Sequence, residues 1–355
     1  MPVRQSRKLD HIHYALTLGD GPSASRFADI SLIHNCLPDL SWQQIDLSTT
    51  VCGLELVHPV FINAITGGAK DVMKTNAMLA ELAQQSRIAM AVGSQFAALE
   101  DPAVLDSYRI VRQYNPDGIL FANLGAHVTP EQAKQAVAMI EADALQIHIN
   151  TAQEILMAEG DRDFRGYLHN VAAIVDAVEV PVIVKEVGCG IAREQARLLV
   201  AAGVRAIDVG GAGGTNFQAI EAARSQRKLE EELYWGIPTA ISAMEVASVL
   251  PASTDLIVSG GVRSGLDVVK AMTIGAAAVG IATPLIKKLY KGGVVAAVLW
   301  LEELLQSVRQ YMLLCGAQNR CELRQTPLII SGYSREWLQA RGIDTAAYAQ
   351  REKHG

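Results

Sequence analysis

The feature that most constrains the fold is the regular alternation of short apolar segments with helical ones. The apolar segments are rich in β-branched residues and end in Gly, Ser, Thr or Asn, as buried parallel strands do. They span residues 59–66, 88–94, 118–124, 144–150, 181–187, 205–210, 255–262 and 276–283. Helical patterns such as 75–86, 129–141, 191–203 and 265–275 separate them. Eight such units in series predict an α/β protein with a (β/α)₈ barrel, also called a TIM barrel.

A doubly wound sheet is the alternative α/β fold, and it usually has a glycine-rich fingerprint after its first strand. The first strand here ends in Thr66, Gly67 and Gly68, which is not that pattern. We therefore expect a single domain over 1–355. It comprises an N-terminal pre-barrel segment at 1–58, the barrel at 59–284 and a tail of C-terminal helices at 285–355.

Composition restricts the partners and the location. The net charge of -6 and the pI near 5.8 argue against nucleic acid or an anionic membrane, which require clustered Lys and Arg. The five cysteines are scattered and form no CxxC pair, so they indicate neither a disulfide framework nor a zinc site. No signal-peptide core or membrane-spanning stretch is evident. We therefore expect a cytoplasmic protein.

The strand at 144–150 has a polar face formed by Gln146, His148 and Asn150, and Gln153 and Glu154 follow it directly. In barrels of this kind the chemistry lies at the carboxyl ends of the strands. The other strand ends are also polar, with Asn63, Thr66, Ser94, Gln95, Asn123, Lys185, Glu186, Thr215, Arg263, Ser264 and Thr283. Asn63, Glu186 and the strand residue Asp208 fit equally well as buried groups that tie strands to loops.

Two glycine-rich strand ends, at 259–265 and 280–283, each place backbone N–H groups beside a helix start. Together they predict a phosphate site, to which Arg263 adds a charge-assisted contact. Lys185 ends an otherwise apolar strand, where an ammonium requires an anionic partner. A flavin ring edge, a Schiff-base substrate and a salt bridge with Asp208 are the alternatives.

These residues resemble the type 2 isopentenyl diphosphate isomerases, which are FMN-dependent. The resemblance covers nearly the whole chain. It rests on the segments 7–12, 63–68, 91–95, 146–150 with Gln153 and Glu154, 184–188, 208–215, and the two phosphate loops. Each segment is weak evidence alone, but their order and spacing are specific.

The resemblance implies interconversion of isopentenyl and dimethylallyl diphosphate in isoprenoid biosynthesis, with FMN, Mg²⁺ and NADPH as flavin reductant. It implies that FMN contacts Ala64, Ile65, Thr66, Ser94, Asn123, Lys185, Thr215, Gly261, Val262, Arg263, Ala282 and Thr283. It implies that the substrate contacts Arg7, Lys8, His11, Ser94, Gln95, Asn150 and Gln153, and that Glu154 binds the metal.

Double-bond migration requires adding a proton to one carbon and removing one from another. The resemblance implies that reduced flavin exchanges the proton, with Gln153, His148 and Lys185 as catalytic residues. An amide is a poor general acid, which favours a positioning role for Gln153. The family is also typically tetrameric or larger, so we expect a homo-oligomer, a tetramer or an octamer.

An FMN-dependent 2-hydroxy-acid oxidase or dehydrogenase is the main alternative, because it shares the strand-five lysine and the glycine loops. Such an enzyme requires a His base and an Arg near the end of strand six, and residues 209–215 contain neither. The stretch 211–235 reads as either a solvated helix or a mobile lid.

Overall fold

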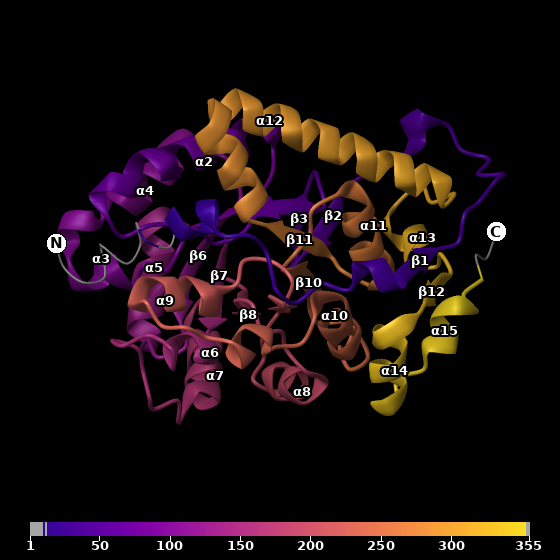
Figure 1. Ribbon diagram of the computed structural model, residues 1–355. Helices are drawn as coiled ribbons and strands as arrows, with labels where there is room; N and C mark the ends of the chain where they lie inside the picture. The colour runs from indigo at the N-terminus through magenta and orange to yellow at the C-terminus, as the bar shows by residue number, and fades with distance from the viewer. Residues whose placement is uncertain (1–9, 11–12, 353–355) are drawn as a thin grey trace.

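The structure is a computed structural model that describes residue 10 and residues 13–352. In this part of the chain, eight parallel strands form a closed barrel (Figure 1), which confirms the predicted fold class. Each strand matches one of the eight predicted segments, and only β6 extends beyond its segment, by one residue. The strands are β4 (Val60–Ile62), β5 (Met90–Ala91), β6 (Leu120–Gly125), β7 (Ala144–Ile149), β8 (Val182–Glu186), β9 (Ala206–Asp208), β10 (Asp255–Ser259) and β11 (Ala278–Ile281). The strands follow one another around the barrel in chain order, and β11 pairs with β4 to close it.

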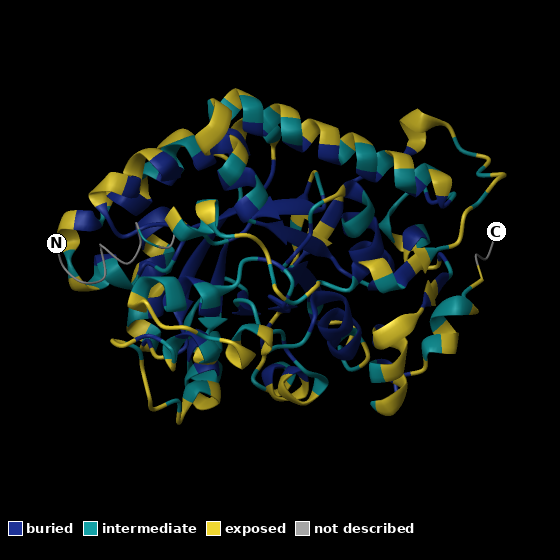
Figure 2. Ribbon diagram, in the orientation of Figure 1, coloured by how far each residue is buried: buried dark blue, intermediate teal, exposed yellow. Residues whose placement is uncertain are grey.

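Helices surround the barrel, as Figure 1 shows. They are α2 (Met73–Ser86), α4 (Asp106–Tyr114), α5 (Pro130–Ile140), α7 (Tyr167–Ala177), α8 (Arg193–Ala201), α10 (Thr239–Ala247), α11 (Gly265–Ile274) and α12 (Thr283–Leu314). The four predicted helical segments are confirmed by α2, α5, α8 and α11. Local signals explain several starts: Thr129 caps α5 and Ser264 caps α11, each in a capping box. Figure 2 shows buried strands at the centre and exposed outer helix faces.

Helix α12 follows β11 directly and packs against both α2 and α11 as the eighth helix of the barrel. Its start at Thr283 lies next to the expected end of the barrel at 284. Gly292 and Gly293 have non-helical dihedral angles and divide α12 at a kink. In the described residues, no helix is both long enough and apolar enough to cross a membrane.

The pre-barrel segment closes the barrel and joins the C-terminal tail. The hairpin of β2 (Thr49–Val51) and β3 (Leu54–Leu56) lies at the amino ends of the barrel strands, where the Thr49 hydroxyl donates to the carbonyl of Ala277 at 2.8 Å. Strand β1 (Ile30–Leu32) pairs antiparallel with β12 (Leu328–Ile330). The short helices α13 (Arg320–Leu323), α14 (Gly332–Ala340) and α15 (Thr345–Ala349) flank β12.

The barrel interior is layered because side chains two residues apart on a strand point to the same side. The lower layer is apolar, with Phe61, Phe121, Ile183 and Ile257 fully buried. Two positions further along the same strands stand polar residues. These are Asn63, Asn123, Lys185 and Ser259, joined by Gln146 and Asp208, which follow Ala144 and Ala206 in the same way. The polar layer therefore lies above the apolar core, toward the carboxyl ends of the strands.

Candidate active site

A cavity of about 500 Å³ opens above the polar layer, at the carboxyl ends of the strands. This volume lies within the range of small-molecule and cofactor sites. Most of the predicted site residues line it: Ala64, Ile65, Ser94, Asn123, His148, Asn150, Gln153, Glu154, Lys185, Thr215, Gly261, Val262, Arg263, Ala282 and Thr283. The structure thus brings together residues from all parts of the barrel sequence. Arg7, Lys8 and His11 lie outside the described residues.

Gln95 and Thr66 do not line the cavity. The buried Gln95 side chain donates to the carbonyl of Ala136 on α5 at 2.8 Å and accepts from the N–H of Asn123 at 2.9 Å. Contrary to the prediction that it binds substrate, Gln95 joins the barrel wall to its helix layer, and its polar atoms are used there. The Thr66 side chain is also buried, and its carbonyl accepts from the N–H of Gly93 at 2.9 Å.

A continuous hydrogen-bonded chain forms the floor of the cavity. Asn63 donates from Nδ2 to Asp208 at 2.8 Å and accepts from Gln146 Nε2 at 3.2 Å. Gln146 in turn accepts from Asn123 Nδ2 at 3.0 Å, and Asn123 Oδ1 contacts His148 Nδ1 at 3.0 Å. The polar inner face of the strand at 144–150 is thereby satisfied within the barrel, as buried polar groups require.

Lys185 extends from β8 into the cavity and is only 5% exposed. Its ammonium donates to the carbonyl of Glu186 at 3.2 Å, and burial lowers its pKa. The neighbouring Asp208 does not form a salt bridge with it. Asp208 instead accepts from Ser259 Oγ at 2.6 Å and from Asn63. The salt-bridge explanation of Lys185 is therefore wrong, and its cation faces the cavity without a carboxylate at ion-pair distance in the described chain.

Glu186 organises the loop that follows β8. Its carboxylate accepts backbone N–H groups from Gly188 at 2.7 Å, Cys189 at 2.5 Å and Gly190 at 3.2 Å. Burial nevertheless raises its pKa to about 7. For Glu186, Asn63 and Asp208, the structure thus supports the reading as buried groups that tie strands and loops together.

The glycine-rich loop 259–265 packs against the loop that follows β9, and glycines are required at this contact. A Cβ on Gly261, where φ is +72°, would lie 2.4 Å from the carbonyl oxygen of Gly213. A Cβ on Gly214 would lie 2.5 Å from the N–H nitrogen of Gly261. Beside them, the hydroxyls of Thr215 and Thr283 are hydrogen-bonded to each other. The backbone therefore forms a concave surface beside the N-terminus of α12, which suits a phosphate group.

Arg263 lines the cavity but already has a carboxylate partner. Its guanidinium forms an ion pair with Asp20 of the pre-barrel segment, with nitrogen-to-oxygen distances of 2.6 and 2.7 Å. It also donates to the carbonyl of Val262 at 2.8 Å. The positive charge predicted for the phosphate loop is thus shared with the pre-barrel segment.

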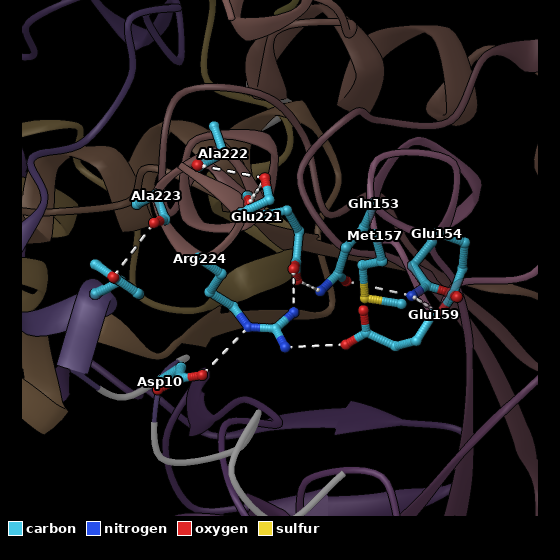
Figure 3. Close-up of polar contacts among 12 residues, drawn as sticks. Asp10, Gln153, Glu154, Met157, Glu159, Glu221, Ala222, Ala223 and Arg224 are labelled. Atoms are coloured by element: carbon cyan, nitrogen blue, oxygen red, sulfur yellow. Dashed lines mark hydrogen bonds and ion pairs between the residues drawn. The ribbon is translucent and has the colours of Figure 1, made fainter. Parts of the chain in front are cut away.

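Gln153 lies on α6 (Thr151–Glu154), and its amide is held on both sides. Figure 3 shows the contact with Glu221. Its Nε2 donates to Glu221 at 2.8 Å, and its Oε1 accepts from Asn150 at 3.2 Å. Glu221 is 1% exposed and forms an ion pair with Arg224. Sequence reasoning missed Glu221, although a Glu and an Arg three residues apart in an apolar helical stretch were a signal.

Arg224 joins three separate segments of the chain, as Figure 3 shows. Besides Glu221, it contacts Glu159 at 2.9 Å and Asp10 at 3.4 Å. The Tyr14 hydroxyl also donates to the carbonyl of Ala223 at 3.4 Å. The start of the described chain is therefore attached to the edge of the cavity.

The segment 211–235 contains α9 (Phe217–Ser225) and a 3₁₀ turn, η5 (Glu231–Tyr234). Helix α9 packs against α6 and buries Ile220 and Glu221, so it is not a solvated helix. The second half is exposed, with Trp235 at 72%. The prediction of a solvated segment therefore fits only the residues after α9.

Glu154 is the predicted metal ligand, and it reaches the cavity with both oxygens engaged. Oε1 accepts from Asn150 Nδ2 at 2.8 Å, and Oε2 accepts from the N–H of Asp161 at 3.1 Å. No group of three or more His, Cys, Asp and Glu side chains that would hold a metal occurs in the described residues. A magnesium ion here would therefore depend on water and ligand oxygens for most of its coordination.

Comparisons with known proteins identify the relatives of this chain. Residues 119–330 match the family model of FMN-dependent dehydrogenases. Isopentenyl-diphosphate delta-isomerases from Geobacillus sp. (strain WCH70) and Symbiobacterium thermophilum are 49% and 46% identical to the chain. The alignments cover 98% and 99% of this chain and 99% and 100% of those proteins. The isomerase of Bacillus pumilus is 47% identical over 98% of both chains.

Solved structures of more distant proteins share the fold. A lactate oxidase of Pediococcus acidilactici superposes with a TM-score of 0.69 at 18% identity, covering 92% of this chain and 91% of that chain. A mandelate oxidase in complex with 3,3-difluoro-2-hydroxy-3-phenylpropionic acid gives a TM-score of 0.66, also at 18% identity, covering 92% and 98%. At this identity the likeness establishes the barrel fold alone.

Proposed function

Because the chain belongs to the isopentenyl-diphosphate delta-isomerase family, within the FMN-dependent dehydrogenases, we propose that its cavity binds FMN, Mg²⁺ and the substrate diphosphate together. The family membership makes the chain an isomerase that interconverts isopentenyl and dimethylallyl diphosphate in isoprenoid biosynthesis. The proposal adds the residues that do this, the metal, and NADPH as the reductant of the flavin.

The buried Lys185 ammonium is the observation that carries the proposal. A cation that is 5% exposed and donates to one carbonyl requires an anionic partner in the cavity. The N1–C2=O edge of a flavin, which becomes negative on reduction, supplies such a partner. The two glycine loops lie beside the same cavity and suit the FMN phosphate. The donor set and the shape of the cavity therefore both fit this cofactor.

The remaining FMN contacts come from residues that line the cavity. We assign them to Ala64, Ile65, Ser94, Asn123, Thr215, Gly261, Val262, Arg263, Ala282 and Thr283. When bound, reduced FMN supplies an electron-rich ring and an exchangeable proton at N5. The cavity walls hold this ring in place and exclude bulk water from the reacting carbons.

The substrate diphosphate fits the side of the cavity formed by β7 and α6. Asn150, His148 and Ser94 line this side, and Glu154 provides one carboxylate for Mg²⁺. A single carboxylate is sufficient when substrate phosphates and water complete the coordination of the ion. We also assign Arg7, Lys8 and His11 to the diphosphate site. Asp10 itself contacts Arg224 at 3.4 Å.

The amide of Gln153 orients the reacting end of the substrate. Its polarity is fixed because Nε2 donates to the Glu221 carboxylate and Oε1 accepts from Asn150. An amide is a weak acid and a weak base, so this fixed orientation favours positioning over proton transfer by Gln153. Lys185 stabilises the negative charge of the reduced ring, and His148 binds the diphosphate.

The alternative, an FMN-dependent 2-hydroxy-acid oxidase or dehydrogenase, has less support. That chemistry requires a His base and a carboxylate-binding Arg near the end of the sixth strand, and residues 209–215 contain neither. The oxidases among the solved structures share the fold at less than 20% identity, whereas isomerases share 39–49% of residues over nearly the full chain.

The test is an anaerobic reaction of isopentenyl diphosphate with the purified protein in D₂O, followed by proton NMR. With FMN, Mg²⁺ and NADPH present, we expect dimethylallyl diphosphate that carries deuterium. Dithionite should replace NADPH, because the nicotinamide only reduces the flavin, whereas EDTA should abolish turnover. Product formation with oxidised flavin would contradict the proposal, and bleaching of the flavin by a 2-hydroxy acid would support the oxidase alternative.

We also propose that the protein is a homo-oligomer, a tetramer or an octamer. The outer face of α12 exposes Tyr290, Val295 and Leu299 while its inner face covers the barrel. Light scattering of the FMN-loaded protein measures the mass directly, and a monomer at micromolar concentration would contradict this expectation.

A further inference from the structure

The chain of amides in the cavity floor has a fixed direction. At one end stands Asp208, which accepts hydrogen bonds from Asn63 Nδ2 at 2.8 Å, Ser259 Oγ at 2.6 Å and the N–H of Gly210 at 3.2 Å. Three donors are the partners that an ionised carboxylate takes, and such a group accepts only. Asn63 must therefore present its NH₂ group to Asp208.

A second contact fixes the same amide independently. The backbone N–H of Ala64, which can only donate, points at Asn63 Oδ1 at 2.8 Å. The carboxylate and the N–H group therefore demand the same orientation of Asn63. This orientation does not depend on how the amide atoms were assigned.

The orientation of Asn63 determines the orientation of the next amides in the hydrogen-bonded row, because each amide has one donating and one accepting end. Since Asn63 offers its oxygen, Gln146 must donate to it from Nε2 and present Oε1 to the next residue. Asn123 then donates to Gln146 and presents its own oxygen to His148 Nδ1 at 3.0 Å. An amide oxygen accepts only, so the proton in this last bond belongs to the imidazole.

We propose that the buried carboxylate of Asp208 fixes the tautomer of His148 through the three amides between them. In the neutral ring Nδ1 therefore carries the proton, and the lone pair that can take up a second proton is on Nε2. His148 is among the residues that line the cavity. Asp208, Asn63 and Gln146 are therefore positioning residues, because they act on the ligand only through His148.

This arrangement matters for an anionic ligand, and here the inference rests on the proposed function. When the neutral imidazole takes up a proton, Nε2 is the only ring nitrogen that can accept it, and no bond of the chain breaks. The new N–H then donates to a phosphate or diphosphate oxygen in the cavity. With the opposite tautomer, the proton would be added at Nδ1, against the amide of Asn123, and nothing would be gained on the cavity side.

The test is nitrogen NMR of the FMN-loaded protein labelled with ¹⁵N in its histidine rings, without substrate. The signals of His148 are those missing from His148→Gln among the eight histidines of the chain. At a pH where the ring is neutral, we expect a pyrrole-type Nδ1 and a pyridine-type Nε2. The opposite pattern would overturn the proposal.

Two variants at Gln146 test whether the chain is the cause. Gln146 is fully buried and does not line the cavity. Gln146→Met removes the acceptor that orients Asn123, and we expect it to populate both tautomers of His148. The matched control Gln146→Glu keeps that acceptor and should keep the wild-type tautomer. An unchanged single tautomer in Gln146→Met would refute control by the amide chain.

The wild-type spectrum alone decides the tautomer, so the proposal can be refuted even if Gln146→Met fails to fold. None of these measurements involves substrate turnover. A protein without isomerase activity but with the expected tautomer would contradict the proposed function and leave this inference standing.

Discussion

Replacement of Lys185 by methionine tests the electrostatics of the cavity most directly. Lys185 is 5% exposed, and its ammonium donates to the carbonyl of Glu186 at 3.2 Å. In the protein without FMN, the variant removes a buried cation and leaves an apolar side chain of similar length. We expect the free energy of unfolding to increase, by an amount on the order of the 1–4 kcal/mol seen when buried ion pairs are replaced by apolar residues.

The same substitution should weaken FMN binding, and more so in the reduced state. A hydrogen bond to a charged group contributes about 1.5–3 kcal/mol, which corresponds to a loss of roughly 12- to 140-fold in affinity for reduced FMN. Oxidised FMN carries no charge at this edge and should lose only about 0.5–1.5 kcal/mol. A tenfold difference between the two states lowers the midpoint potential of the bound flavin by about 30 mV.

Anaerobic fluorescence titrations with oxidised and dithionite-reduced FMN measure both affinities, and urea denaturation measures the stability of the FMN-free protein. Lys270→Met is the matched control. Lys270 is another buried lysine, it donates to the carbonyl of Phe27 at 2.8 Å, and it does not line the cavity. Equal losses for both flavin states in Lys185→Met, or a similar loss in Lys270→Met, would refute the reasoning.

The pH dependence has a definite sign. Burial lowers the pKa of Lys185 in the folded protein below its ordinary value of 10.5. At a pH between the lowered pKa of the folded protein and the ordinary pKa of the unfolded chain, the unfolded chain binds more protons than the folded one. The stability of the FMN-free protein therefore rises with pH in this interval. Lys185→Met should abolish that contribution, and a denaturation series at increasing pH would detect the difference.

Three further predictions concern other parts of the site. Gly261→Ala should weaken FMN binding more than tenfold, since its Cβ would lie 2.4 Å from a facing carbonyl oxygen. Gly166→Ala, at φ +83° with no atom within 4 Å, has the backbone cost of about 1–2 kcal/mol alone and should leave the FMN titration unchanged. Glu221→Leu should lower kcat roughly 10- to 100-fold with little change in KM, because it removes the acceptor that holds the Gln153 amide; an unchanged kcat in steady-state assays would refute this role. Burial raises the pKa of Glu186 to about 7, so the unfolded state binds fewer protons between pH 4.5 and 7 and stability should fall across that window. Urea denaturation should show the fall in wild type and its absence in Glu186→Gln.

The fold was predictable because its signals are local. Each barrel strand is a short apolar run with a polar or glycine end, and the helices between them carry their own caps, such as Thr129 and Ser264. The rule that chemistry lies at the carboxyl ends of barrel strands then placed most of the cavity lining correctly.

Sequence reasoning could not predict where each strand ends or which long-range partners a site residue has. Gln95 has the same parity as the inward-facing Ala91, but β5 ends at Ala91 and Gln95 is helical in its dihedral angles, so parity no longer predicts its direction. Arg263 meets Asp20, 243 residues away, and Gln153 meets Glu221, 68 residues away. These contacts join residues that are far apart in the sequence, so no local sequence pattern predicts them.

The polar layer has one feature that the local sequence predicts and another that depends on the closed barrel. Its composition follows from a local rule, because a polar residue stands two positions after an apolar one on strand after strand, as with Phe61 and Asn63. Its hydrogen-bond direction exists only in the closed barrel. There a carboxylate on β9 orients the amide of Asn63, directly after β4, and this amide orients the amides of β7 and β6. The sequence thus specifies which groups are buried together. The barrel decides which of them donates, and so which nitrogen of His148 receives a proton from the cavity.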